Sequence, residues 1–149
     1  MVLVSEKLDG VPIRMDVDIC EGAVAVTART RQDEVSYSTQ FIQQYLAHKM
    51  LGWRPSKLTF VGEVTHEDYT DFKDISGVVR RQEPQTGLIY NIFDFYDEAR
   101  PDDGFAQRLF AAGCLLKMQT RSIRFIPQSY IKREDITDWF ANNLRSGAE

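Results

Sequence analysis

The sequence of 149 residues lacks any apolar run near the roughly 20 residues that a membrane-spanning helix needs. It also has little cysteine. Cys20 and Cys114 stand alone, without the spacing of a metal site, and they indicate reduced thiols in a cytosolic protein. The first ten residues lack the basic leader of a secretory signal peptide. We therefore expect a cytoplasmic chain with no membrane partner.

A basic excess is missing as well, because the formal net charge is −4. A free-standing nucleic-acid binder usually carries a surplus of lysine and arginine. Any contact with nucleic acid should therefore be local, or come partly from another domain. Apolar residues make up 43% of the chain and aromatic residues 11%, which is enough for the packed core of one domain and argues against disorder.

Strands and helices are predicted in a mixed order along the chain. Apolar and polar residues alternate over 11–18, which is typical of a half-buried strand, and Glu21-Gly22 predicts a turn into another strand over 23–31. The remaining patterns predict strands at 2–9, 57–66, 87–97 and 123–131, and helices at 38–52, 68–82, 102–119 and 133–147. Strands and helices without strict alternation predict an α+β fold with a largely antiparallel sheet flanked by helices.

Four local signals make these predictions more specific. Ser38 or Thr39 is expected to cap the helix that Gly52 ends. One face of this helix should be apolar, formed by Phe41, Ile42, Tyr45, Leu46 and Met50. The helix over 68–82 should carry basic residues in its last turn, where the helix dipole favours them. Pro127 should break the last predicted strand or place it at a sheet edge.

Lys7, Asp9 and Gly10 form a short K-x-D-G pattern in "SEKLDGVPIR". The bare pattern is weak, and a solvated lysine before a turn is its commoner meaning. Here Lys7 follows the apolar residues of 2–4, so we expect it at the end of a buried strand. Partial desolvation there would favour the neutral amine that acts as a nucleophile.

Four further short elements follow in the chain. "ARTRQDE" contains Arg31, "FVGEV" ends an apolar strand with Glu63, "IYNIFDFY" contains Phe93, and "SGAE" ends in Glu149. With "EKLDG", these elements resemble in order the motifs of ATP-dependent DNA ligases and their covalent nucleotidyltransferase relatives, and their compact spacing resembles bacteriophage-type ligases. "YTDFKDISGVVRR" also resembles the helix that follows the third motif in ligases.

The resemblance implies an ATP-grasp-like nucleotidyltransferase fold and a three-step reaction. Lys7 would attack the α-phosphate of ATP and carry the AMP. The AMP would then pass to the 5′-phosphate of nicked double-stranded DNA, and the 3′-hydroxyl would displace it to seal the strand. Each step is a displacement at phosphorus, in which positioning and neutralisation of charge dominate.

The resemblance also implies roles for the other motif residues. Glu63 and Glu149 would coordinate Mg²⁺, which prefers a few carboxylates plus phosphate oxygens. Arg31 would hold a phosphate through its fork of donors. Phe93 would stack on adenine. Ser5 and Glu6, beside Lys7, would contact the nucleotide.

Two departures from the family pattern affect these expectations. Pro12 stands where most ligases have an arginine, and Arg14 follows two residues later, on the same side of an extended strand but about 6–7 Å away. A bulge near Pro12 would shorten that gap, so we predict that Arg14 binds the nucleotide or the nick. The second departure is the end of the chain.

The sequence stops within the fifth motif, so we expect residues 1–149 to be a fragment of an adenylation domain. The later K-x-K motif and the C-terminal oligonucleotide-binding domain of the family do not follow. We therefore expect a monomer whose parent protein ligates, while the chain itself adenylylates weakly and does not seal nicks.

Several alternatives stay open at this point. An RNA ligase or a capping-type transferase would use the same chemistry. A nucleotide- or nucleic-acid-binding module without turnover would keep the fold, and Pro12 favours it. A purely structural α+β domain is the plainest reading. His66-Glu67-Asp68 indicates a polar loop. Arg80-Arg81 could touch a DNA backbone, but the pair is taken as solvated.

Overall fold

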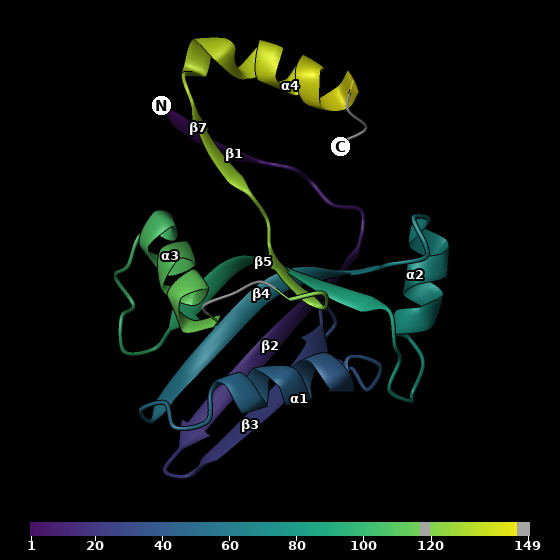
Figure 1. Cartoon of the computed structure of the whole chain (residues 1–149), viewed down its shortest axis with the longest axis vertical. Coiled ribbons are helices and arrows are strands. Elements are labelled where there is room, and N and C mark those ends of the chain that lie inside the picture. The colour runs from purple at the N-terminus through teal and green to yellow at the C-terminus, as the bar shows by residue number, and fades with distance from the viewer. Residues whose placement is uncertain (117–119, 146–149) are drawn as a thin grey trace.

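A computed structural model describes residues 1–116 and 120–145 of the chain (Figure 1). Its main sheet has five strands in the spatial order β3-β2-β4-β5-β6. The strands are β2 (Val11–Cys20), β3 (Ala23–Thr30), β4 (Ser56–His66), β5 (Leu88–Asp97) and β6 (Ile123–Phe125). All neighbours pair antiparallel except β5 and β6, which pair parallel. The predicted α+β fold with a largely antiparallel sheet is confirmed.

Three helices cover one face of this sheet. In Figure 1, α1 (Gln40–Lys49) crosses the sheet, with α2 (Phe72–Val79) and α3 (Phe105–Leu116) at its two sides. The alternating residues of β2 bury their apolar members in one core that also contains side chains of all three helices. The opposite face of β2 carries Arg14 and Asp18, which are exposed. The sheet therefore has a covered apolar face and a polar face.

A small second sheet stands apart from the five strands. β1 (Val2–Ser5) pairs antiparallel with β7 (Gln128–Ile131), and α4 (Ile136–Arg145) follows after a short 3-10 turn over Arg133–Asp135. These elements lie above the main sheet in Figure 1. The strand predicted over 123–131 is split into β6 and β7 at Pro127, as expected for a residue that cannot donate to a ladder. No helix within 1–116 or 120–145 is long and apolar enough to cross a bilayer.

The prediction of a buried strand ending in Lys7 is wrong. β1 ends at Ser5, and Lys7 is exposed in the loop that follows. The physical reason is the pairing of β1 with β7 alone, since a two-stranded sheet leaves the residues of β1 only partly covered or exposed. Burial of the strand therefore cannot supply the desolvation that the sequence suggested for Lys7.

The capping prediction for α1 is confirmed in its position and wrong in its hydrogen bond. Thr39 occupies the N-cap position but makes no capping hydrogen bond. Its hydroxyl lies 3.0 Å from the hydroxyl of Ser36, and the Ser38 hydroxyl donates to the carbonyl of Val79 at 2.7 Å. The Ser38 hydroxyl therefore connects the start of α1 to α2, and the Thr39 hydroxyl bonds within the segment before α1 instead of capping it. Phe41, expected on the apolar face, is 49% exposed.

Two smaller predictions need correction. The basic residues of α2 lie outside its last turn, because the helix ends at Val79 and Arg80 is its C-cap. His66 ends β4 rather than lying in a loop; its Nδ1 accepts a hydrogen bond from the backbone of Asp68. Gly52, which was expected to end α1, has a φ of +78° in the turn after the helix.

Candidate active site

Glu63, on the polar face of the sheet, lies among three other charged residues that the sequence singled out. Burial raises the pKa of Glu63 above its ordinary value, and the negative charge of Asp9 acts in the same direction. A hydrogen bond from the Gly10 backbone N–H and the positive charges of Lys7 and Arg31 oppose this shift. Charges from the loop after β1 and from the turn after β3 therefore act on one carboxylate of β4.

Gly10 fixes the loop that carries Lys7. Its N–H donates to Oε2 of Glu63 at 3.2 Å. A Cβ at this position would lie 2.6 Å from the backbone oxygen of Val64, so a larger residue would push the loop away from β4. The glycine of the K-x-D-G pattern is thus required by the close approach of two backbones.

Asn91, which sequence reasoning missed, supports Glu63 from β5. It is buried and lies opposite Glu63 in the β4–β5 pairing. Its side-chain amide donates to the Glu63 carbonyl at 3.1 Å and to the Thr65 hydroxyl at 3.0 Å. No motif marks this residue, because its partners lie on a strand more than 25 residues away. It therefore holds β4 and β5 together at the position of the candidate carboxylate.

The β4–β5 pairing contains a bulge beside the site. Val61 pairs with Asp94 and Gly62 pairs with Ile92, so Phe93 is an extra residue without a partner on β4. Phe93 is half-buried. The bulge takes Phe93 out of the regular alternation of side chains between the two faces of β5. Its stacking on adenine stays a prediction.

Asp94, the next residue, anchors α3 to this part of β5. Both of its carboxylate oxygens accept hydrogen bonds from Arg108, each at 2.9 Å. The Tyr96 hydroxyl donates to the same carboxylate at 2.9 Å, and the Arg108 guanidinium lies 4.6 Å from the centre of the Tyr96 ring. A bidentate pair of this kind fixes geometry as well as charge. It therefore holds the strand immediately after Phe93.

Pro12 lies directly opposite Glu63 in the sheet. The pairing of β2 with β4 runs without a register shift from Val11 to Ile19, so the bulge suggested near Pro12 is not present in this ladder. Arg14 lies opposite Val61 instead, and it bonds to Asp16 at 3.0 Å and to Asp33 at 3.3 Å. These carboxylates occupy the guanidinium that was expected to replace the missing arginine.

The remaining predicted residues are placed less closely. Ser5 is exposed at the end of β1, opposite Gln128, and Glu6 is exposed in the following loop. Among the described residues, no hydrogen bond or ion pair joins Ser5, Glu6 or Phe93 to Glu63. Glu149 lies outside the described residues.

Solved structures match this chain in fold. One described as "Pmar-Lig_Pre." has a TM-score of 0.75 and 17% identity, covering 99% of this chain and 36% of its own. "Pmar-Lig_PreS3" has a TM-score of 0.74 with the same identity and coverage. A structure from "DNA binding with a minimal scaffold: Structure-function analysis of Lig E DNA ligases" has a TM-score of 0.62 and 19% identity, covering 99% of this chain and 52% of its own.

The chain has a ligase-type fold. It spans about a third to a half of the length of these structures. No protein-family model matches the sequence, and neither does any curated protein. At identities below 20% this likeness shows the fold, and a shared fold does not by itself determine the chemistry.

Glu63 gives a prediction about pH and stability. Because its pKa is higher in the folded chain than its ordinary 4.5, the folded chain binds more protons in the interval above 4.5. Wild type should therefore lose stability relative to Glu63→Gln as pH rises through that interval. Urea unfolding of both proteins at about pH 4 and about pH 7.5 measures this difference. A wild type that gains stability relative to the variant over this range would contradict the assignment.

Proposed function

We propose that this chain is the adenylation part of an ATP-dependent DNA ligase, with Lys7 as the residue that accepts AMP. The observation that carries the proposal is the convergence of Lys7, Arg31 and Glu63 from three separate elements. The ligase-type fold supports it. Because the chain spans only part of the matched structures, sealing of nicked DNA is proposed for a longer protein.

The chemistry needs a neutral amine next to a bound triphosphate. The Lys7 ammonium first loses a proton, and its lone pair then forms the N–P bond to the α-phosphorus. The bond from that phosphorus to the β-phosphate oxygen breaks, and pyrophosphate leaves with the electron pair. The nitrogen loses a second proton, which yields a lysyl-AMP phosphoramidate. Arg31 holds phosphate oxygens during this exchange.

The carboxylates of the site fit a small hard cation. Mg²⁺ takes one or two carboxylates together with substrate phosphates and water. Glu63 and Asp9, whose charges act on each other, would hold the Mg²⁺ ion. The Gly10 N–H bonds to Oε2 of Glu63, so Oε1 remains available to the ion. No cluster of three acidic, histidine or cysteine ligands occurs in the described residues, so phosphate oxygens would have to complete the shell. The ion would neutralise charge on the phosphates.

A second function is favoured by one feature, the neighbourhood of Pro12. Pro12 places no guanidinium opposite Glu63, and Arg14 is paired with Asp16 and Asp33 on the polar face. Such a site could bind a nucleotide without transferring it. The same ligase-type fold would then be a nucleotide-binding module that does not turn over.

Covalent labelling separates the two functions. The purified chain is incubated with Mg²⁺ and α-labelled ATP, GTP or NAD⁺, and then run on a denaturing gel. We expect an acid-labile label that survives denaturation with ATP, at low stoichiometry. Absence of label with all three nucleotides, from a chain that binds ATP in equilibrium dialysis, would replace the enzyme with the binding module.

A further inference from the structure

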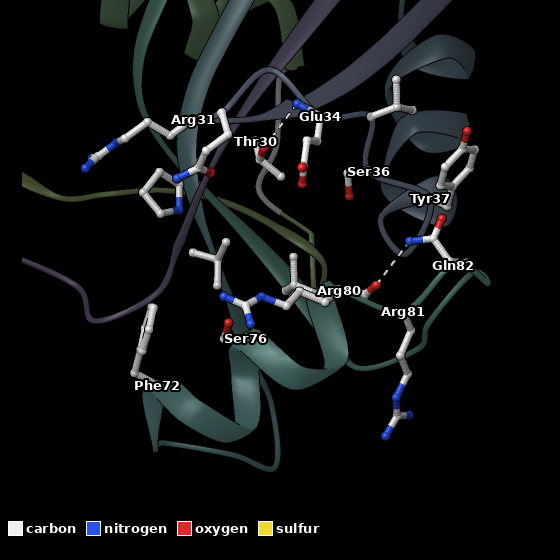
Figure 2. Close-up of a pocket in the computed structure, with 15 residues that line it drawn as sticks. Thr30, Arg31, Glu34, Ser36, Tyr37, Phe72, Ser76, Arg80, Arg81 and Gln82 are labelled. Atoms are coloured by element: carbon white, nitrogen blue, oxygen red, sulfur yellow. Dashed lines mark hydrogen bonds between the residues drawn. The ribbon is translucent and has the colours of Figure 1, made fainter.

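A cavity of about 500 Å³ lies next to the candidate active site (Figure 2). It opens between the start of β2, the loop after β3 and the helix α2. Pro12, which pairs with Glu63 on the neighbouring strand β4, lines one side, and Ser76 of α2 lines the other. Arg31 therefore belongs both to the lining of the cavity and to the charged residues that act on Glu63.

Two consecutive arginines at the end of α2 differ in direction. Figure 2 shows the Arg80 side chain extending back along α2 above Ser76. Arg81 also belongs to the lining of the cavity, but its side chain extends away from the cavity in Figure 2. Arg81 donates to the side chain of Gln85 at 3.0 Å. Within 1–116 and 120–145, no hydrogen bond or ion pair engages the guanidinium of Arg80. Arg80 therefore has a free fork of donors at the cavity.

The charges around the cavity favour an anion. Arg31, Arg80 and Arg81 line it, and Arg31 also lacks a hydrogen bond or ion pair among the described residues. Glu34 is the acidic residue in the lining, and the neighbouring Asp33 is paired with Arg14 and Arg29. On a chain of net charge −4, this positive surplus is a local feature.

The exposed aromatic residues of the lining indicate a strand rather than a free phosphate. Tyr37 is 51% exposed and Phe72 is 47% exposed at the two sides of the cavity. Arginine forks bind phosphate oxygens, and aromatic rings beside a basic groove contact bases and sugars of nucleic acids. The hydroxyl of Ser76, which also lines the cavity, is a further group that can bond to a phosphate or sugar oxygen.

We propose that this cavity holds the backbone of one DNA strand beside the nick, with Arg80 bound to a phosphate. The inference rests on the proposed function, because it takes nicked DNA as the substrate. It assigns to Arg80, which the sequence analysis took as solvated, a positioning contact with the strand. The phosphate contact fixes the strand relative to Lys7 and carries no base specificity.

Adjacent arginines provide a matched test. Arg80→Ala and Arg81→Ala each remove one charge, and fluorescence anisotropy measures their binding to a labelled duplex with a nick that lacks the 3′-hydroxyl. We expect Arg80→Ala to weaken binding about tenfold and to lower the salt slope by about 1, whereas Arg81→Ala changes affinity less than about twofold. Thermal melting of both variants checks that each remains folded.

The outcomes distinguish this proposal from the proposed function. Equal affinities of Arg80→Ala and wild type, or equal losses in the two variants, would overturn the DNA site. A weaker apparent affinity for ATP in the labelling reaction of Arg80→Ala, with DNA binding unchanged, would also overturn it and assign the cavity to the nucleotide. Absence of label from ATP in the wild type would contradict the proposed enzymatic function. A selective loss of DNA binding in Arg80→Ala would support the DNA site even in that case.

Discussion

Lys7→Ala and Lys7→Arg are both expected to lose covalent labelling by ATP down to background. Alanine has no amine, and arginine keeps the charge but stays protonated and offers no free lone pair. The arginine variant therefore separates nucleophilic attack from simple attraction of the triphosphate. Gel autoradiography after incubation with α-labelled ATP gives the readout.

Lys57→Ala is the matched control for this experiment. Lys57 lies on β4, the strand that carries Glu63, but it is exposed and pairs opposite Asp18 at the far end of the β2–β4 ladder. We expect normal labelling from this variant. Because Lys7 is exposed, its replacement should change the free energy of unfolding by no more than about 0.5 kcal/mol. Label on Lys7→Arg at the wild-type level would remove Lys7 as the nucleophile.

Gly62→Ala is expected to destabilise the fold by about 3 kcal/mol and to lower the melting temperature by about 10 °C. A Cβ at Gly62 would lie 2.4 Å from the Asn91 carbonyl oxygen and 2.8 Å from the Tyr90 ring. The Tyr90 ring is buried at this position, and its hydroxyl proton is shared between the carbonyls of Ile13 on β2 and Phe60 on β4, at 2.9 and 3.0 Å. Any side chain at 62 would push this ring or β5 away from β4.

Gly77→Ala makes the same substitution where space is open. Gly77 lies inside α2, and a Cβ there would meet no atom within 4 Å. Alanine has the higher helix propensity, so this variant should be more stable by up to about 1 kcal/mol. Differential scanning calorimetry should show a lower melting temperature for Gly62→Ala and a higher one for Gly77→Ala than for wild type. A Gly62→Ala variant that melts with wild type would show that β4 and β5 are not packed as described.

The fold class and the element order were predictable because they depend on local patterns. Alternation placed β2, and Pro127 divided the last predicted strand. The prediction for Lys7 failed because burial of β1 depends on how many strands join its sheet. That number is a tertiary property, and the apolar residues of 2–4 carry no information about it.

The site was predictable only as far as short motifs reach. In the structure, the charges of Lys7 and Arg31 act on Glu63, and the roles of these residues stay predictions. Asn91 and Arg108 were missed because their partners lie on other elements, at separations set by strand register and helix packing. Arg80 was taken as solvated, since only the structure shows that it and Arg81 point in different directions.

Mapping the AMP to a residue tests most directly whether Lys7 is the residue that carries it. The chain is incubated with ATP and Mg²⁺, digested under conditions that preserve phosphoramidates, and analysed by tandem mass spectrometry. We predict one AMP adduct, on Lys7, in the peptide that contains Asp9 and Gly10. An adduct on any other lysine, or non-covalent ATP alone, would contradict the assignment of Lys7 as the residue that carries AMP.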